Sequence, residues 1–206
     1  MNQYLIDTEF AVQSLFDLVT HELNQINALE IVLNERRENA RKIYSDAYYV
    51  TDLDGDDLET PEMYMRRNGY VQHASAAQKI QSEISKLEES YKSKDSSIRT
   101  LYGSILQIAK QGLSTVFRGS IQTAIIEPNT GEPIHNIILQ GRNQSMHFEE
   151  GINKKPVKEC FMKLQLAFGN DFDLNIGDNK AKFVVVDALG WRTYHDYLTT
   201  MNQLLP

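Results

Sequence analysis

Residues 96–117, SSIRTLYGSILQIAKQGLSTVF, decide the fold, because they carry the most regular apolar pattern in the chain. Apolar side chains recur there at steps of three and four residues, as one face of a helix requires. They are Ile98, Leu101, Tyr102, Ile105, Ile108, Ala109, Leu113, Val116 and Phe117. Asp95 suits the start of this helix as its N-cap, and Gly119 suits its end. We therefore expect an amphipathic helix that packs against other helices.

A second helical pattern precedes it near the N-terminus. Between Thr8 and Tyr49, apolar residues keep the helical spacing, and neither proline nor glycine interrupts them. The pattern predicts one unusually long helix, or two helices with a subtle break at residues 34–39. A helix of this length in a small protein usually packs against a partner copy as well as its own domain.

The segment between these two patterns contains an acidic loop and a third helix. TDLDGDDLE, residues 51–59, lacks the glycine and glutamate spacing of a calcium-binding EF-hand, so a solvated loop is the better interpretation. Thr60 and Pro61 then form a good helix start. The apolar positions between Met63 and Tyr91 predict an amphipathic helix with a possible joint at Gly69.

Shorter elements follow in the C-terminal half. Residues 121–139 hold two apolar runs around a turn, and they predict a loop or small hairpin that leads into a helix beginning near Pro133. That helix closes at Gly151, and another runs from Pro156 to Gly169. The run at residues 183–186, FVVV, is typical of a strand, and residues 191–205 predict a final helix.

The predicted fold is therefore mainly α, a helical bundle with a long N-terminal helix and minor β near the C-terminus. We expect an N-terminal helical region at residues 1–93, which is a possible surface for dimerisation or for a partner, and a helical domain at residues 94–206. No membrane span is expected, because no apolar run approaches the roughly 20 residues that a membrane requires.

Composition narrows the class of protein further. The chain has 206 residues and a formal net charge of −7, which argues against a broad binding surface for duplex DNA. Cys160 is the single cysteine, so no intramolecular disulfide is possible, and its apolar setting predicts a core position. The first ten residues lack the basic start and apolar middle of a secretion signal. These features predict a cytoplasmic protein.

The stretch GRNQSMHFEEG, residues 141–151, brings together side chains that can act on phosphate esters. His147 can exchange a proton near neutral pH, for example with a ribose 2′-hydroxyl. Arg142 carries a permanent charge in a planar fork that matches phosphate oxygens. Asn143 can orient either group. This chemistry requires no cofactor and no metal, and the usual ligand spacings of metal sites are missing from the stretch.

The helical spacing separates two of these side chains. Asn143 and His147 are one turn apart and project from the same side of a helix. Arg142 and His147 diverge by about 140° and by about 7.5 Å of rise on a straight helix. They cannot touch each other, yet a long arginine can reach a ligand that the imidazole also reaches.

Arg142-Asn143-x-x-x-His147, on a late helix of a small α bundle, resembles the signature of the HEPN family (higher eukaryotes and prokaryotes nucleotide-binding). That signature is an arginine, then four to six residues, then a histidine, commonly with a polar residue directly after the arginine. The resemblance covers residues 95–168. It implies a homodimer that brings two motif copies to one cleft, and metal-independent cleavage of RNA that leaves a cyclic phosphate.

The resemblance also implies a biological setting. Many HEPN proteins belong to toxin–antitoxin or antiviral defence systems, so an antitoxin or another defence protein is a possible partner. We therefore expect an endoribonuclease in which Arg142 and His147 are catalytic and Asn143 orients them. The alternative is a non-catalytic HEPN-like interaction protein, such as an antitoxin, adaptor or assembly subunit, that binds through residues 8–91. Nucleotide binding without cleavage is a third, weaker possibility.

Other residues compete with this site or add to it. Arg67-Asn68 and His73 form a second, looser match, but it includes Gly69 and is therefore poorly placed to hold a fixed geometry. His135 lies shortly before the motif and is a weaker candidate. The lysines that follow the motif can provide the positive potential that an RNA backbone needs. They are Lys154, Lys155 and Lys158.

Overall fold

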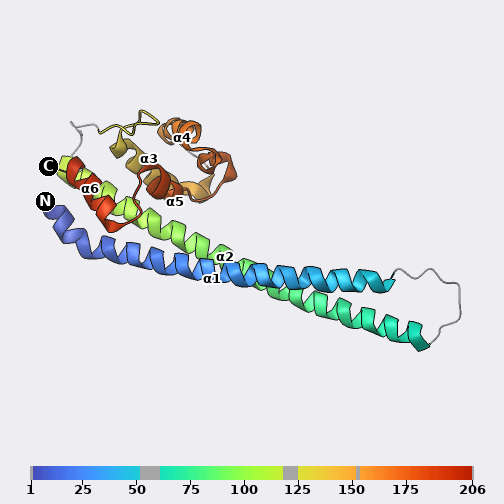
Figure 1. Cartoon of the computed structure of the whole chain (residues 1–206). Helices are drawn as coiled ribbons and strands as arrows, with labels where there is room; N and C mark the ends of the chain where they lie inside the picture. The colour runs from blue at the N-terminus through green and yellow to red at the C-terminus, as the bar shows by residue number, and fades with distance from the viewer. Residues whose placement is uncertain (1, 52–60, 118–124, 152–153, 206) are drawn as a thin grey trace. The chain divides into compact units, whose positions relative to one another are not determined.

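The computed structural model describes residues 2–51, 61–117, 125–151 and 154–205, and these are mainly helical (Figure 1). The longer helices are α1 (Gln3–Thr51), α2 (Pro61–Phe117), α3 (Ile134–His147), α4 (Lys155–Phe168) and α6 (Tyr194–Leu204). The short ones are α5 (Ala181–Phe183), the 3-10 helices η1 (Phe148–Glu150), η2 (Asn170–Phe172) and η3 (Leu174–Ile176), and the π-helix η4 (Val184–Ala188). The expected mainly α class is confirmed.

Contacts divide the chain into two compact units. One unit contains residues 1–23 together with 96–206, and the other contains residues 24–95. Helices α1 and α2 each contribute to both units. The expected division between residues 93 and 94 stays a prediction. The acidic segment 51–59 lies, apart from Thr51, outside the described residues.

The unit of residues 24–95 is an antiparallel pair formed by α1 and α2. Leu33 and Ala40 of α1 are buried against Ile84 of α2. The first two are seven residues apart, so a continuous apolar seam faces the partner helix. An exposed ion pair of 2.7 Å joins Arg37 to Glu88 and adds little stability. The seam explains why α1 has no break at residues 34–39.

Helix α2 is longer than the sequence predicts. The expected joint at Gly69 and the expected new helix start at Asp95 are both wrong, because α2 passes through both positions. Residues 92–97 contain neither proline nor glycine, so nothing ends the helix before the next apolar face begins. Gly69 is tolerated at a cost of about 1 kcal/mol relative to alanine.

The other unit has its core around the C-terminal half of α2. Fully buried side chains from α2, α3, α4 and α6 contribute to it, and of those in α2 the sequence pattern predicted Ile98 and Ile105 but not Leu106. They are Ile98, Ile105 and Leu106 of α2, Ile137 and Ile138 of α3, Phe161 and Leu164 of α4, and Tyr197 of α6. Trp191 packs edge-on against Tyr197, with 5.0 Å between the ring centroids. This core holds α3, with the Arg142 motif, against α2.

The expected strand at residues 183–186 is wrong. These residues are helical, because α5 continues directly into η4. Val184 and Val185 are adjacent and fully buried, although consecutive residues of a strand point to opposite faces. Burial in the core thus overrides the β preference of a valine run.

The elements around these helices agree with the sequence signals. Residues 125–133 form a tight loop with an isolated antiparallel bridge between Ile126 and Pro133, directly before α3. Helix α4 begins with Pro156 in its first turn and ends at Gly169. Among the described helices, none combines the length and the apolar character that crossing a membrane requires.

Gly141 is a position of α3 where the packing leaves no room for a larger side chain. A Cβ atom there would lie 2.7 Å from Val184 Cγ1. We predict that Gly141→Ala lowers the free energy of unfolding by about 1–3 kcal/mol, because valine cannot rotate away without strain. Urea unfolding followed by circular dichroism measures this loss.

The matched control is Gly69→Ala, because nothing lies within 4 Å of the added Cβ. That variant should gain up to about 1 kcal/mol from its better helix propensity. The loss in Gly141→Ala should shrink when Val184→Ala is added. Equal losses with and without Val184→Ala would show that the clash is not the cause.

Candidate functional site

The end of α3 carries all three residues of the Arg142 motif. Pro133 precedes the helix in an extended conformation, and the helix ends at His147. The 3-10 helix η1 follows at once and is closed by Gly151, whose φ of +65° favours glycine. His147 at the end of α3 and the acidic residues of η1 are exposed, whereas Gly141 and residues 144–145 of the same helix are buried.

Arg142 is half-buried and is held by a residue of α2. Its Nε donates a hydrogen bond of 2.5 Å to Gln107 Oε1. One terminal nitrogen, Nη1, donates a longer bond of 3.3 Å to Asn143 Oδ1. The guanidinium is thus fixed through Nε, which leaves most of its terminal N–H groups for an anion.

A chain of polar side chains connects Arg142 to the start of α3. Asn143 donates to Gln140 over 3.4 Å, and Gln140 donates to Asn136 over 2.9 Å. Asn136 in turn donates to the carboxylate of Glu132 over 2.6 Å. Glu132 also forms an ion pair with Lys163 of α4. These amides occupy one side of α3, and each fixes the orientation of the next.

His147 is bound to an acidic residue one turn further along the chain. Its Nδ1 lies 2.7 Å from Glu150 Oε1. The two side chains keep 50% and 62% of their accessible surface, so the pair is open to a ligand. The contact fixes the ring through Nδ1 and leaves Nε2 as the nitrogen that can exchange a proton with a substrate.

The structure does not join Arg142 and His147 within one chain. Arg142 binds Gln107 on α2, whereas His147 binds Glu150 in η1. Asn143 contacts Arg142, and within the described residues it makes no hydrogen bond to His147. The two reactive groups therefore point along different directions from α3, as their spacing predicts.

A cavity of about 560 Å³ lies beside Arg142. Its walls come from α2, from the last turn of α3, from η1 and from the segment before α5. Gln107 lines this cavity and is also the acceptor of the Arg142 hydrogen bond. The remaining lining combines apolar side chains such as Phe148 with polar ones such as Ser145.

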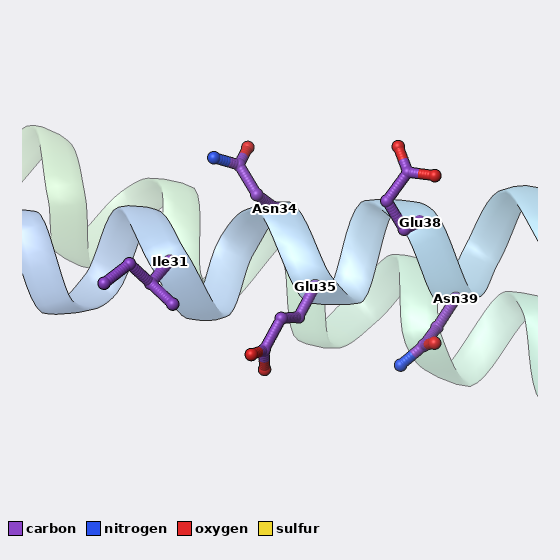
Figure 2. Close-up of a pocket in the computed structure, with 5 residues that line it drawn as sticks. All are labelled: Ile31, Asn34, Glu35, Glu38 and Asn39. Atoms are coloured by element: carbon purple, nitrogen blue, oxygen red, sulfur yellow. The ribbon is translucent and has the colours of Figure 1, made fainter.

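A second hollow, of about 610 Å³, lies on the surface of α1. Figure 2 shows that Asn34 and Glu38 project to one side of the helix, whereas Ile31, Glu35 and Asn39 project to the other. The described lining comes from α1 alone, so this is a shallow surface feature between two rows of one helix. Its residues do not converge on a common point.

His135 does not reach the motif. It lies on the first turn of α3, about 18 Å from His147 along the helix axis. Its Nδ1 is buried and has no hydrogen-bond partner among the described residues. Burial lowers the pKa of His135, against the opposing effect of the Glu132 carboxylate. His135 is thus partly buried and remote from His147.

The rival match lies on α2. Asn68 is exposed and His73 is half-buried, while the side chain of Arg67 lies outside the described residues. Because α2 is continuous at Gly69, a helix joint gives no reason to discount this match, and it stays a competitor to be tested.

Residues near the motif divide into charged surface and core. Lys154, Lys155 and Lys158 are all exposed at the start of α4. Cys160 is buried, and burial raises the pKa of its thiol to about 12, so it is not a nucleophile at neutral pH. Within the described ranges, no group of three or more His, Cys, Asp or Glu side chains is arranged to hold a metal ion.

Two contacts of the site were not predicted from the sequence. Gln107 is a polar residue beside an apolar helix face, and no local pattern marks it as a partner of Arg142. Glu150 follows the motif closely, but nothing in the sequence alone selects it as the partner of His147. A three-residue separation across the α3 to η1 junction is the signal that points to it.

Comparisons of the chain with protein-family models, with curated proteins and with solved structures gave no match.

The polar groups at the start of α3 predict a specific dependence of stability on pH. Burial alone would raise the pKa of Glu132, but hydrogen bonds from Lys163 and Asn136 bring it below its ordinary value. The pKa of Glu127 is also lowered, because hydrogen bonds from Thr130 and Asn129 outweigh the effect of burial. Carboxylates of this kind stabilise the fold above the unfolded pKa, and the contribution is lost as the pH falls.

We therefore expect two steps of destabilisation on acidification. Below the ordinary histidine value of 6.5, the unfolded chain takes up a proton that buried His135 resists. Below the ordinary glutamate value of 4.5, Glu127 and Glu132 lose their contribution. Thermal unfolding between pH 7.5 and about 2.5 measures both steps. His135→Asn should remove the first step, and Glu127→Gln should remove part of the second. If the first step persists in His135→Asn, its assignment to His135 is wrong.

Proposed function

We propose that the protein is a metal-independent endoribonuclease of the HEPN type, acting in a toxin–antitoxin or antiviral defence system. The observation that carries the proposal is how the two reactive side chains are held. Arg142 is fixed through Nε by Gln107, and His147 is fixed through Nδ1 by Glu150. In both residues the nitrogens that the chemistry needs stay available, at the accessible end of one helix.

Arg142 is the phosphate-binding group in this proposal. Its terminal N–H groups pair with the non-bridging oxygens of the RNA linkage and stabilise the charge that grows on them in the transition state. The contact to Gln107 limits the positions that the long side chain can adopt. Asn143 accepts from Arg142 and keeps the guanidinium plane in place.

His147 is the proton-transfer group. Its Nε2 takes the proton of the ribose 2′-hydroxyl while the 2′-oxygen forms a bond to phosphorus. The bond from phosphorus to the 5′-oxygen breaks, the 5′-oxygen leaves with a proton returned by an imidazolium, and a 2′,3′-cyclic phosphate remains. The carboxylate of Glu150, 2.7 Å from Nδ1, stabilises the imidazolium that forms.

Two copies of the chain complete the proposed site. Within one chain Arg142 and His147 diverge and share no partner, so a single copy does not direct both groups at one phosphate. A homodimer in which the ends of two α3 helices face each other places Arg142 of one copy near His147 of the other. This requirement agrees with the dimer that the HEPN resemblance implies.

The charge around the site suits a small contact with RNA. The whole chain has a formal net charge of −7, which opposes binding along an extended surface. Lys154, Lys155 and Lys158 are exposed directly after the motif, where they add local positive potential. We infer that the protein takes single-stranded or looped RNA and leaves duplex DNA unbound.

The first test measures cleavage of RNA by purified protein in excess EDTA. We predict that the wild-type chain cleaves and leaves cyclic phosphate ends. His147→Ala should lose about 10²–10⁴-fold in rate, because general acid–base catalysis contributes that much. Arg142→Gln should lose about 10²-fold or more, because it removes the charge that meets the transition state.

His195→Ala is the matched control, because His195 is exposed on α6 and lies outside the motif. It should keep the wild-type rate. Equal cleavage by the wild type and His147→Ala would remove the catalytic assignment. Loss of activity in His73→Ala alone would move the site to the rival match on α2.

The second test asks whether the site is shared between copies. We predict that Arg142→Ala and His147→Ala are each inactive, and that a refolded mixture of the two regains activity. The mixed dimer has one cleft in which the remaining arginine and histidine come from different chains. Gel filtration with light scattering confirms the dimer. A mixture that forms dimers and stays inactive would show that each chain uses its own pair.

A non-catalytic interaction protein is the second candidate function. The unit of residues 24–95 exposes large apolar side chains, namely Ile31 at 62%, Val71 at 58% and Tyr44 at 54%. Exposed apolar groups on paired helices are typical of a surface that meets another helix. This candidate gains weight if the wild-type chain fails to cleave RNA and instead binds a partner protein through this unit.

A further inference from the structure

We propose that the cavity of about 560 Å³ beside Arg142 binds a nucleobase of the substrate RNA, with guanine preferred. The inference rests on the proposed ribonuclease function and names the part of the RNA that this function reads. The volume falls within the range of small-molecule sites in proteins, about 300–1,000 Å³.

The charge of the cavity lining favours a neutral base over a phosphate group. The described walls contain one carboxylate, Glu149, and no lysine or arginine. A phosphate would be repelled there, whereas a neutral base would not. Arg142 provides the cation just outside the cavity and binds Gln107 over 2.5 Å. A nucleotide with its phosphate at Arg142 can therefore place its base in the cavity.

The shape and polarity of the walls suit a flat heteroaromatic ring. Phe148, Met146 and Ile108 provide apolar surface, and a half-buried phenyl ring can stack on a base. Gly103 also lines the cavity, and a Cβ there would lie 2.8 Å from the Ser145 hydroxyl, so α2 and α3 meet closely at this wall. Stacking on an aromatic ring contributes about 1–3 kcal/mol per base.

Polar groups of the lining keep free hydrogen-bonding capacity. The Nε2 group of Gln107 and the hydroxyl of Ser145 make no hydrogen bond to the described residues. The carboxylate of Glu149 is likewise without a basic partner in the described part of the chain. It accepts hydrogen bonds only. Guanine presents two adjacent donors, N1–H and N2–H, which fit the two oxygens of a carboxylate.

The wall formed before α5 is held rigidly. Arg99 donates to the carbonyl of Asn179 over 2.9 Å and pairs with Asp178 over 2.6 Å. Asn179 Oδ1 accepts from Ala181 N, and Gln144 of α3 donates to the carbonyl of Asp178 over 2.8 Å. Because these contacts already fix the wall, little conformational entropy is lost in ordering it when a base binds. A rigid wall therefore favours bases whose shape fits the cavity.

The test measures binding without cleavage. The probes are 5′-fluorescein trinucleotides U-X-U with 2′-O-methyl groups throughout, in which X is each of the four bases. These methyl groups block attack by the 2′-oxygen. Fluorescence anisotropy should give at least about fivefold tighter binding for X = G than for X = U, as a well-aligned pair of hydrogen bonds provides.

Variants then assign the preference to the cavity. Glu149→Gln should remove the preference for guanine and favour adenine, because an amide pairs with the mixed donor and acceptor edge of adenine. Phe148→Ala should weaken all four probes about fivefold or more. Glu89→Gln, a change at an exposed residue of α2 that does not line the cavity, should keep the wild-type order. Circular dichroism confirms that each variant is folded.

The results of these experiments test the base site and the proposed ribonuclease function separately. Equal affinity for the four bases, or a guanine preference that persists in Glu149→Gln, overturns the base site even if the wild-type chain cleaves RNA. A guanine preference that Glu149→Gln removes, in a protein that cleaves no RNA in EDTA, supports the base site and overturns the ribonuclease proposal.

Discussion

Helix α3 lies so close to α2 and to η4 that two positions have no room for a Cβ atom. A Cβ on Gly141 would lie 2.7 Å from Val184, and a Cβ on Gly103 would lie 2.8 Å from the Ser145 hydroxyl. This approach sets the position of the site. Gln107 is one turn beyond Gly103 and Arg142 directly follows Gly141, so the same contact that packs the helices brings the amide to the guanidinium.

A series of hydrogen-bonded polar side chains runs from the loop before α3 to Arg142. From Glu132 through Asn136, Gln140 and Asn143, each side chain is bonded to the next, and the series ends at Arg142. A buried polar group is costly unless it is paired, so the members of the series specify one arrangement of the helix. The anchor at the far end is the ion pair of Glu132 with Lys163, which ties α3 to α4. The orientation of the motif is therefore coupled to the packing of the core.

The sequence allowed much of the fold to be predicted and less of the site. The apolar spacing of residues 98–113 correctly identified the face of α2 that forms the core, and Pro156 and Gly169 marked the ends of α4. The run at residues 183–186 was wrongly predicted as a strand, because β propensity says nothing of burial by neighbouring helices. The contact of Gln107 with Arg142 was missed for a related reason. It joins residues 35 positions apart, and only the packing of α3 on α2 brings them together.

The same packing keeps Arg142 and His147 apart within one chain. Arg142 is directed toward α2 by Gln107, and any movement toward His147 would break that bond and disturb Asn143. His147 is held at the opposite flank by Glu150. Arg142 and His147 each have a hydrogen-bond partner nearby, so turning toward each other would break these bonds. In the ribonuclease that we propose, they would meet at one phosphate only where a second copy of the chain brings its own His147 next to Arg142. For the proposed ribonuclease, the hydrogen bonds that fix the motif thus favour a site shared between two copies over one within a single chain.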